Sequence, residues 1–362
     1  MATTSHRIAC IPGDGIGHDV IPAARAVLEA AGRARGFALE LDEHPWGCDY
    51  FVEHGRMMPP DGLEQLRDSD AILLGAVGRP DVPDHISLWG LLIPIRRTFR
   101  QYVNLRPIRV FDGLPSPLRA ADNGPIDFVV VRENAEGEYS EAGGRFNRGL
   151  PDELAIQESI FTRAGITRIA DFALRLAETR RREVTSATKS NGIVHTLPFW
   201  DEVVAERAAH HPDVALRQEH IDALCAKLVL RPQRFDVIVA SNLFGDILSD
   251  LAAAVAGSIG IAPSANLNPE RGFPSMFEPV HGSAPDIAGQ AIANPLGAIW
   301  SGAMMLEHLG EQAAADDILG AIAGVLAAGD VRTPDLGGDA TTEQLAAAVT
   351  AALPATSSVA GE

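Results

Sequence analysis

Lysine is almost missing from this chain. Only two of its 30 basic side chains are lysines, Lys189 and Lys227, and the others are arginines. Arginine keeps its proton at physiological pH, so a remaining lysine can mark a place where an amine must lose one. Lys227 lies in an ordinary helical segment, however, and drift in composition is the alternative explanation.

Positive charge, long apolar runs and paired cysteines are also scarce. The formal net charge of −18 leaves no overall positive field for nucleic acid or an anionic membrane. No apolar run approaches the roughly 18 residues of a membrane span, and the N-terminus lacks a signal peptide's apolar core. The three cysteines, far apart, form neither a disulfide framework nor a zinc motif. We therefore expect a cytoplasmic protein with no nucleic-acid or membrane partner.

Strand-like and helix-like segments alternate along the chain. Apolar runs at residues 7–11, 71–76 and 126–131 are each followed by a helical or turn segment, which predicts an α/β fold. The sequence GDGIG at residues 13–17 resembles a dinucleotide-binding loop. His18 occupies the third glycine position, however, and no clear acidic ribose partner follows, so we do not expect a Rossmann fold.

The stretch FDVIVASNLFGDILSD, residues 235–250, is a buried-strand pattern that runs into a helix. Asp246 and Asp250 are four residues apart, so they project from one helix face with about 5–6 Å between their Cβ atoms. A hard cation such as Mg²⁺ or Mn²⁺ would relieve their repulsion. For an isolated pattern of this kind, two solvated surface carboxylates are the commoner outcome.

Other charged residues follow strand-like runs. Arg132 comes directly after an apolar strand, at the end where α/β proteins place ligands, and Tyr139 lies shortly beyond it. Lys189 follows another such run, where a cation nearby or partial desolvation would lower its pKa from about 10.4 and make it a base. Arg96 and Arg106 can offer planar forks to a dicarboxylate, although solvated surface arginines explain them equally well.

Late in the chain, residues 278–295 form a segment rich in glycine and proline. Its backbone N–H groups can bind an anion, and Asp286 can accept hydrogen bonds from a ribose hydroxyl. As a lone motif it would be consistent with a structural loop as well.

Six motifs together carry a family resemblance, and they occur in one order over nearly the whole chain: GDGIG, NLRP, VRENAEGEYS, TKSNG, SNLFGDILSD and EPVHGSAPDIAGQAIANP. In this order they resemble the β-decarboxylating dehydrogenases, the isocitrate and isopropylmalate dehydrogenase family. The segments DHISLWGLLIPIRR and APSANLNPER resemble the tartrate and D-malate dehydrogenase branch of that family most closely.

The resemblance implies a fold of two interleaved α/β domains. Residues 1–107 and 266–362 would form the larger, cofactor-binding domain. Residues 108–265 would form the smaller domain, with the metal ligands and the interface of a homodimer. The active site would lie in the cleft between the domains.

The resemblance also implies the roles of site residues. Substrate carboxylates would be held by Arg96, Arg106 and Arg132, with Ser87 and Trp89 nearby. Mn²⁺ or Mg²⁺ would be bound by Asp246, Asp250 and Asp222 of the partner subunit. Lys189 of the partner subunit would take the hydroxyl proton, and Tyr139 would protonate the enol left by loss of CO₂. NAD would be bound by Glu278, His281, Gly282, Ser283, Ala284, Asp286, Ile287 and Asn294.

The expected reaction is oxidation and β-decarboxylation of (R)-malate, to pyruvate and CO₂, or of tartrate. Trp89 adds bulk where isopropylmalate enzymes accommodate the isopropyl group, although 3-isopropylmalate stays the alternative substrate. Asp286 would repel a 2′-phosphate, which favours NAD over NADP. A binding relative without turnover is the other alternative, but it would not need both Tyr139 and Lys189. The sequence leaves open whether K⁺ is required.

Overall fold

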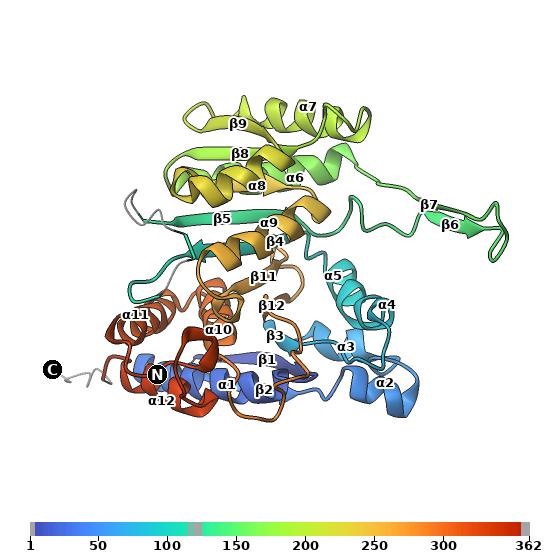
Figure 1. Cartoon of the computed structure of the whole chain (residues 1–362). Coiled ribbons are helices and arrows are strands. Elements are labelled where there is room, and N and C mark those ends of the chain that lie inside the picture. The colour runs from blue at the N-terminus through green and yellow to red at the C-terminus, as the bar shows by residue number, and fades with distance from the viewer. Residues whose placement is uncertain (1–3, 115–116, 119–124, 356–362) are drawn as a thin grey trace. The chain divides into compact units, whose positions relative to one another are not determined.

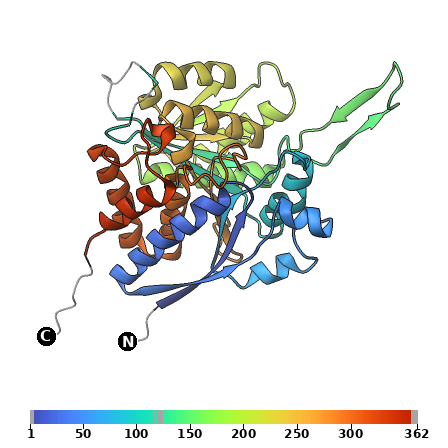
Figure 2. The same ribbon diagram turned by 60° about the horizontal axis from the view of Figure 1, so that its bottom comes forward.

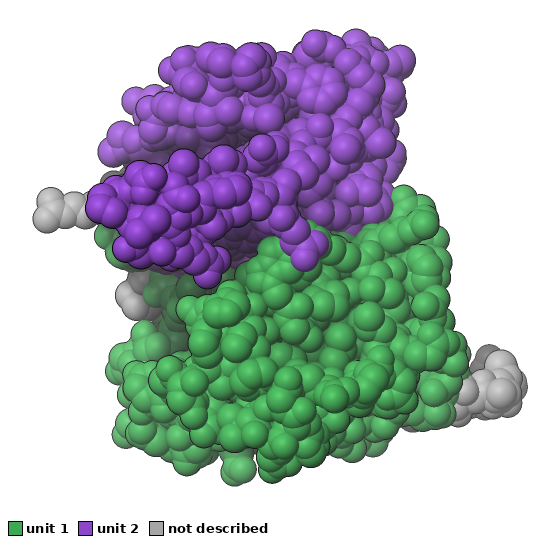
Figure 3. Space-filling model, turned by 90° about the vertical axis from the view of Figure 1, so that its right-hand side faces the viewer, with its two compact units in different colours: residues 1–101, 110–117, 256–362 green, residues 102–109, 118–255 purple. Residues whose placement is uncertain are grey.

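A computed structural model describes residues 4–114, 117–118 and 125–355. The chain divides into two compact units (Figure 3). Unit 1 comprises Met1–Gln101, Val110–Pro117 and Ala256–Glu362, and unit 2 comprises Tyr102–Arg109 and Leu118–Val255. Both mix helices with a mainly parallel sheet, so the α/β prediction is confirmed. No helix in the described part of the chain is long and apolar enough to span a membrane.

The sheet of unit 1 has the strand order β2-β1-β3-β12-β11 (Figure 1). Its strands are β1 (Thr4–Gly13), β2 (Phe37–Glu43), β3 (Ala71–Ala76), β11 (Pro263–Leu267) and β12 (Ser275–Pro279). Neighbours pair in parallel except for β11, which is antiparallel to β12. All six residues of β3, AILLGA, are buried, as expected for a central parallel strand covered on both faces.

The helices of unit 1 are α1 (Gly17–Arg35), α2 (Cys48–His54), α3 (Gly62–Arg67), α4 (Asp84–Ser87), α5 (Ile93–Thr98), α10 (Leu296–Leu309), α11 (Gln312–Ala328) and α12 (Thr342–Ala351). Helices α1 and α10 pack on this sheet, whereas α11 packs on α10 and α12 packs on α1. Short 3₁₀ turns lie at Ile259–Ile261 and Pro334–Leu336. Helix α1 buries Val20, Ala24, Val27 and Leu28, which recur at helical spacing, and it ends at Gly36 in the left-handed conformation.

The sheet of unit 2 has the order β4-β5-β10-β8-β9. Its strands are β4 (Val103–Arg109), β5 (Asp127–Glu133), β8 (Glu183–Thr188), β9 (Ala215–His220) and β10 (Val237–Ala240). Its helices are α6 (Arg163–Glu178), α7 (Thr196–Ala208), α8 (Ile221–Leu230) and α9 (Asn242–Val255), with a 3₁₀ turn at Pro232–Arg234. Strands β5, β10, β8 and β9 are parallel, so their carboxyl ends share one edge of the sheet.

A two-stranded arm extends from the body of unit 2 in two views (Figures 1 and 2). It consists of β6 (Gly143–Phe146) paired antiparallel with β7 (Leu154–Gln157), and every residue of both strands is exposed. An isolated two-stranded ribbon of this kind is at most marginally stable by itself in water. Phe146, Leu154 and Ile156 are exposed apolar side chains of this arm.

Candidate active site

The junction between β10 and α9 brings together Arg132 and Asp246, two charged residues of unit 2 that the sequence predicted as site residues. Arg132 is paired with Ala240 across the parallel strands β5 and β10, and α9 begins two residues after that alanine. Gly245, in the first turns of α9, faces the arginine stem: a Cβ atom there would lie 2.6 Å from Cβ and Cγ of Arg132. A larger residue at this position would push the arginine off the helix.

Arg132 is only 3% exposed, and its guanidinium is bound by residues of α9. Nε and Nη2 donate to Oδ1 of Asn242 at 3.1 and 2.8 Å, and Nη1 donates to Oδ1 of Asp246 at 2.5 Å. A buried cation needs such partners because desolvation without them is costly. The fork of Arg132 is therefore held in one fixed orientation.

Tyr139 lies beside this pair. Its hydroxyl donates to Oδ2 of Asp246 at 2.8 Å, and the guanidinium of Arg132 is 5.6 Å from the centre of its ring. Burial, and then the carboxylate of Asp246, raise the pKa of Tyr139 above its usual value. The hydroxyl therefore stays protonated at neutral pH and can act as a proton donor.

Arg106 and Asp250 complete the cluster. Nη1 of Arg106 donates to Oγ of Ser249 at 2.6 Å and to Oδ1 of Asp250 at 3.2 Å, and its Nη2 is 3.6 Å from Oδ1 of Asp246. Although 57% of the Asp250 side chain is exposed, its pKa is raised by desolvation and by the Asp246 carboxylate, against the opposing effect of Arg106. The α9 carboxylates thus repel each other even with two arginines beside them.

The two α9 aspartates fit a hard divalent cation. They supply carboxylate oxygens one helical turn apart, which Mg²⁺ and Mn²⁺ prefer. A cation would offset both the desolvation, which is the main cause of the raised pKa of Asp250, and the repulsion from Asp246. Within one chain, the described residues contain no group of three His, Cys, Asp or Glu side chains placed to hold a metal.

Lys189 and Asp222 form a second, open cluster in unit 2. Nζ of Lys189 donates to Oδ1 of Asp222 at 2.7 Å, with 31% and 68% of the two side chains exposed. This hydrogen bond is the main cause that lowers the pKa of Asp222. Lys189 follows β8 and Asp222 begins α8, so neighbouring parallel strands present them at one edge.

The predicted residues of unit 1 near the first arginine lie on an irregular helix. A π-helical turn (Leu88–Leu92) separates α4 from α5 and carries Trp89, whose ring is 4.9 Å from the guanidinium of Arg97. Such turns are frequent at functional sites. Arg96, in α5, donates to Oε1 of Glu278 at 2.7 Å, while Ser87 bonds a carbonyl of its own helix. A predicted substrate residue is thus paired with a predicted cofactor residue.

The predicted cofactor segment is held mainly through backbone atoms. The N–H of Ile16 donates to the carbonyl of Ser283 at 2.8 Å, and the N–H of Gly289 donates to Asp19 at 3.0 Å. Gly15 has φ +57°, and a Cβ atom there would lie 2.0 Å from the Ser283 carbonyl oxygen. The GDGIG turn therefore needs this glycine in order to lie against the cofactor segment.

Individual residues of this segment differ in exposure. His281 and Ser283 are buried, and burial lowers the pKa of His281, which keeps its ring neutral. Asp286 is exposed. Asn294 donates to Asp335 at 2.9 Å and accepts from the N–H of Leu296. Gly282, Ala284 and Ile287 lie in the same loop, with Ala284 at φ +38°.

The comparisons with known proteins agree with one another. The sequence profile described as isocitrate/isopropylmalate dehydrogenase matches residues 7–349. This chain belongs to the isocitrate/isopropylmalate dehydrogenase family. It is 59% identical to a tartrate dehydrogenase/decarboxylase of Pseudomonas putida, over 96% of this chain and 98% of that one. It is 58% identical to a decarboxylating D-malate dehydrogenase of Escherichia coli, over 95% and 97%.

Solved structures show the same family. The isocitrate dehydrogenase of Methylococcus capsulatus superposes with a TM-score of 0.87 at 35% identity, covering 96% of this chain and 99% of that chain. A β-decarboxylating dehydrogenase of Thermococcus kodakarensis does so with a TM-score of 0.77 at 39% identity, covering 96% of each. The protein is therefore an enzyme of the decarboxylating dehydrogenase family, and the predicted fold is confirmed.

The sequence analysis did not predict two polar residues that bind the arginines of this site. Asn242 binds the fork of Arg132, and Ser249 binds Arg106. A signal was available, because Asn242, Asp246 and Ser249 recur at helical spacing on one face of α9.

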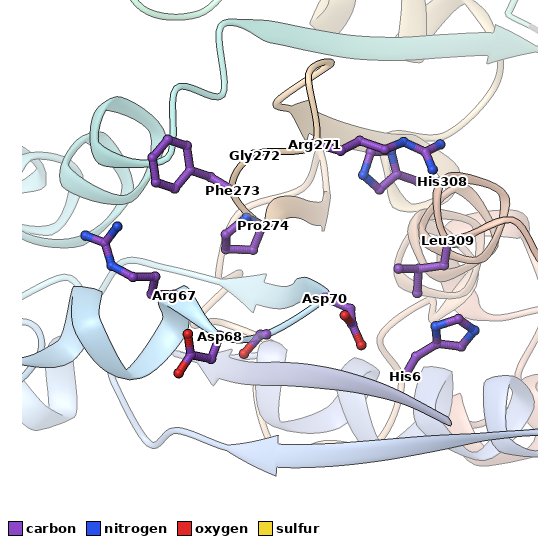
Figure 4. Close-up of a pocket in the computed structure, with 11 residues that line it drawn as sticks. His6, Arg67, Asp68, Asp70, Arg271, Gly272, Phe273, Pro274, His308 and Leu309 are labelled. Atoms are coloured by element: carbon purple, nitrogen blue, oxygen red, sulfur yellow. The ribbon is translucent and has the colours of Figure 1, made fainter. Parts of the chain in front are cut away.

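One polar cavity of unit 1 contains none of the predicted residues. It has a volume of about 370 Å³ and is lined by His6, Arg67, Asp70, Arg271, Phe273 and His308, among others (Figure 4). It lies by the amino ends of β1, β3 and β12, the opposite end of these strands from the GDGIG turn. Ligands of open α/β sheets bind at the carboxyl ends of the strands, so we assign this cavity no part in the reaction.

Proposed function

We propose that this family member oxidises and β-decarboxylates (R)-malate or tartrate with NAD⁺ and Mn²⁺ or Mg²⁺. The observation that carries the proposal is the cluster in which Arg106, Arg132 and Tyr139 meet the α9 aspartates. It unites forks for carboxylates, oxygen ligands for a cation and a protonated acid. The two relatives named above, which act on tartrate and D-malate by their names, support this choice of substrate.

Each residue has a distinct task in this reaction. Arg96, Arg106 and Arg132 bind and orient the substrate carboxylates. Lys189 takes the proton of the substrate hydroxyl as hydride leaves, and Tyr139 later gives its proton to the enol carbon. An acid and a base of different type serve these successive steps.

Two groups would supply the remaining chemistry. The segment from Glu278 to Asn294 would hold NAD⁺, which would supply the hydride acceptor. Asp246 and Asp250 would hold a divalent cation, which would supply a Lewis acid for the substrate oxygen.

We further propose a homodimer with shared active sites. Of the twelve exposed large apolar side chains in the described residues, ten lie in unit 2, including Phe146 and Ile156 of the arm and Leu230 of α8. Ile247 of α9 is 49% exposed and directly follows Asp246. An apolar surface beside the metal ligands suits a second copy of this chain, whose Asp222 and Lys189 would complete the site.

Trp89 supports the choice of a small acid. It stands on the π-helical turn before Arg96, where its ring would reduce the room for a branched alkyl group. The second candidate substrate is 3-isopropylmalate, because the part of it that reacts is the same as in D-malate. We expect Trp89→Ala to raise activity on 3-isopropylmalate relative to D-malate. An unchanged ranking of substrates would remove Trp89 from the account of specificity.

The test of the proposed function is NADH formation with Mn²⁺ against D-malate, L-malate, L-tartrate, meso-tartrate, isocitrate and 3-isopropylmalate. A clear preference for D-malate or tartrate is the expected result. A preference for 3-isopropylmalate would leave the proposed roles of the catalytic residues unchanged but would contradict the role of Trp89 in substrate choice. The same assay with NADP⁺ tests Asp286, since equal kcat/KM for both cofactors would contradict NAD specificity.

A further inference from the structure

Glu138 directly precedes Tyr139, and its carboxylate reaches the first turn of α9. Oε1 of Glu138 accepts a hydrogen bond from the hydroxyl of Ser241 at 2.7 Å, and Oε2 accepts one from the N–H of Leu243 at 3.0 Å. Helix α9 has no acidic residue in its own first turn. A carboxylate here satisfies an N–H that has no partner inside the helix and opposes the positive end of the helix dipole.

The segment that carries Tyr139 is attached to α9 at two further points. The hydroxyl of Tyr139 donates to Asp246, and the side-chain amide of Asn242 donates to the carbonyl of Glu136 at 3.2 Å. Glu138 is the residue whose backbone leads directly into the tyrosine. The position of the hydroxyl therefore depends on where the Glu138 carboxylate fixes that backbone against the helix.

We propose that Glu138 is a positioning residue that sets the Tyr139 hydroxyl against α9. The inference rests on the proposed function, in which the electron pair of the enol C=C bond takes the Tyr139 proton to form a C–H bond, while the enol O–H bond breaks, its proton goes to water and the ketone C=O forms. The phenolate left by breaking the O–H bond then regains a proton from water. Hydride transfer comes before this step and does not use Tyr139. Loss of Glu138 should therefore slow the later step alone.

Glu136 provides a matched control in the same segment. Its carboxylate accepts hydrogen bonds from the N–H and the hydroxyl of Thr162 at 2.9 and 2.8 Å, at the start of α6. Like Glu138, it fastens the segment to a helix start with two hydrogen bonds. That helix carries no proposed catalytic residue, so its loss should not move the tyrosine hydroxyl against Asp246.

The first experiment compares first-turnover and steady-state NADH formation in the full-length wild type, E138A, E138Q and E136A, with NAD⁺, Mn²⁺ and the best substrate of the panel. In E138A we expect kcat to fall roughly tenfold or more, because small misplacements of an acid have large effects. KM and the first-turnover rate should stay within about twofold, so that a burst of NADH appears. E138Q keeps an oxygen for the Leu243 N–H and should restore most of kcat, and E136A should show no burst.

Three kinetic results would each overturn the proposal: equal loss of the first-turnover rate and kcat in E138A, a burst of the same size in E136A, or no recovery in E138Q. Hydrogen exchange in the free proteins gives a second readout, independent of turnover. The amides of residues 242–245 should exchange faster in E138A than in E136A, and equal exchange would show that Glu138 anchors nothing. If the wild type turns over no acid in the panel, the proposed function fails, and the exchange result still decides the role of Glu138.

Discussion

The two units hold their proposed functional residues by different means. In unit 2, charged side chains hold one another: Arg132 binds Asp246, which accepts from Tyr139. In unit 1, side chains hold Glu278 and Asn294, but the loop between them is held through its backbone, as in the contact between Ile16 and Ser283. Side-chain substitutions in unit 2 should therefore lower kcat while the fold stays intact. In unit 1, NAD⁺ binding should be most sensitive to substitutions where two backbone segments lie closest together.

The largest effect is expected for the base in unit 2. Lys189→Ala should lower kcat by roughly 10²–10⁴-fold, the usual contribution of a general acid or base. Binding of NADH, followed by its fluorescence, should stay within a few-fold. Lys189→Arg should not recover activity, because a guanidinium keeps its proton, while added methylamine should restore part of the rate in the alanine variant only. Normal turnover in Lys189→Ala would remove the lysine from the mechanism.

A hybrid experiment tests whether Lys189 and Asp222 of one subunit share an active site with Asp246 and Asp250 of the other. Asp246→Asn and Lys189→Ala should each be inactive as homodimers. In a co-expressed mixture, half of the dimers are hybrids with one intact shared site, so about a quarter of wild-type activity should return. Activity measured on the purified mixture decides. No recovery, with subunit mixing verified by mass spectrometry, would mean that each chain completes its own site.

In unit 1, where the backbone holds the cofactor segment, we expect a smaller effect, on NAD⁺ affinity rather than on kcat. Gly15→Val places a side chain against the carbonyl of Ser283 and should weaken NAD⁺ binding by about tenfold, which corresponds to about 1.4 kcal/mol. At saturating NAD⁺, kcat should change little. Gly36→Ala is the control, because its φ of +81° is also strained but no atom lies within 4 Å of the added Cβ. Calorimetric titration of both variants measures the effect, and equal affinities would contradict the supporting role of the GDGIG turn.

The smallest effect concerns pH and the stability of unit 1. Burial lowers the pKa of His308 to about 4, from an ordinary value of 6.5. Between pH 6.5 and 4 the unfolded chain therefore binds a proton that the folded chain does not, and the free energy of unfolding falls as the pH falls. His308→Gln should lessen this fall by about 1–4 °C in melting temperature at pH 5 relative to pH 7.5. An unchanged pH dependence would show that His308 contributes nothing to it.

Much of the site could be predicted because its signals are local. The strand-to-helix transition in SNLFGDILSD places Asp246 and Asp250 on one face by helical spacing alone. Arg132 was identified for the same reason, since the end of an apolar strand is readable from neighbouring residues. The ordered motifs then identified the family, because each preserves a local backbone requirement as well as a chemical group.

Tertiary structure alone decided which groups meet. Arg96 and Glu278 are 182 residues apart in sequence, and their pairing depends on the packing of α5 beside β12. Glu138 and Ser241, 103 residues apart, become partners only once β5 and β10 lie side by side. The sequence by itself determined the fold class, through its hydrophobic periodicity, and the residues proposed for the reaction, through its local motifs. The contacts between them depend on strand order and register, which no local pattern encodes.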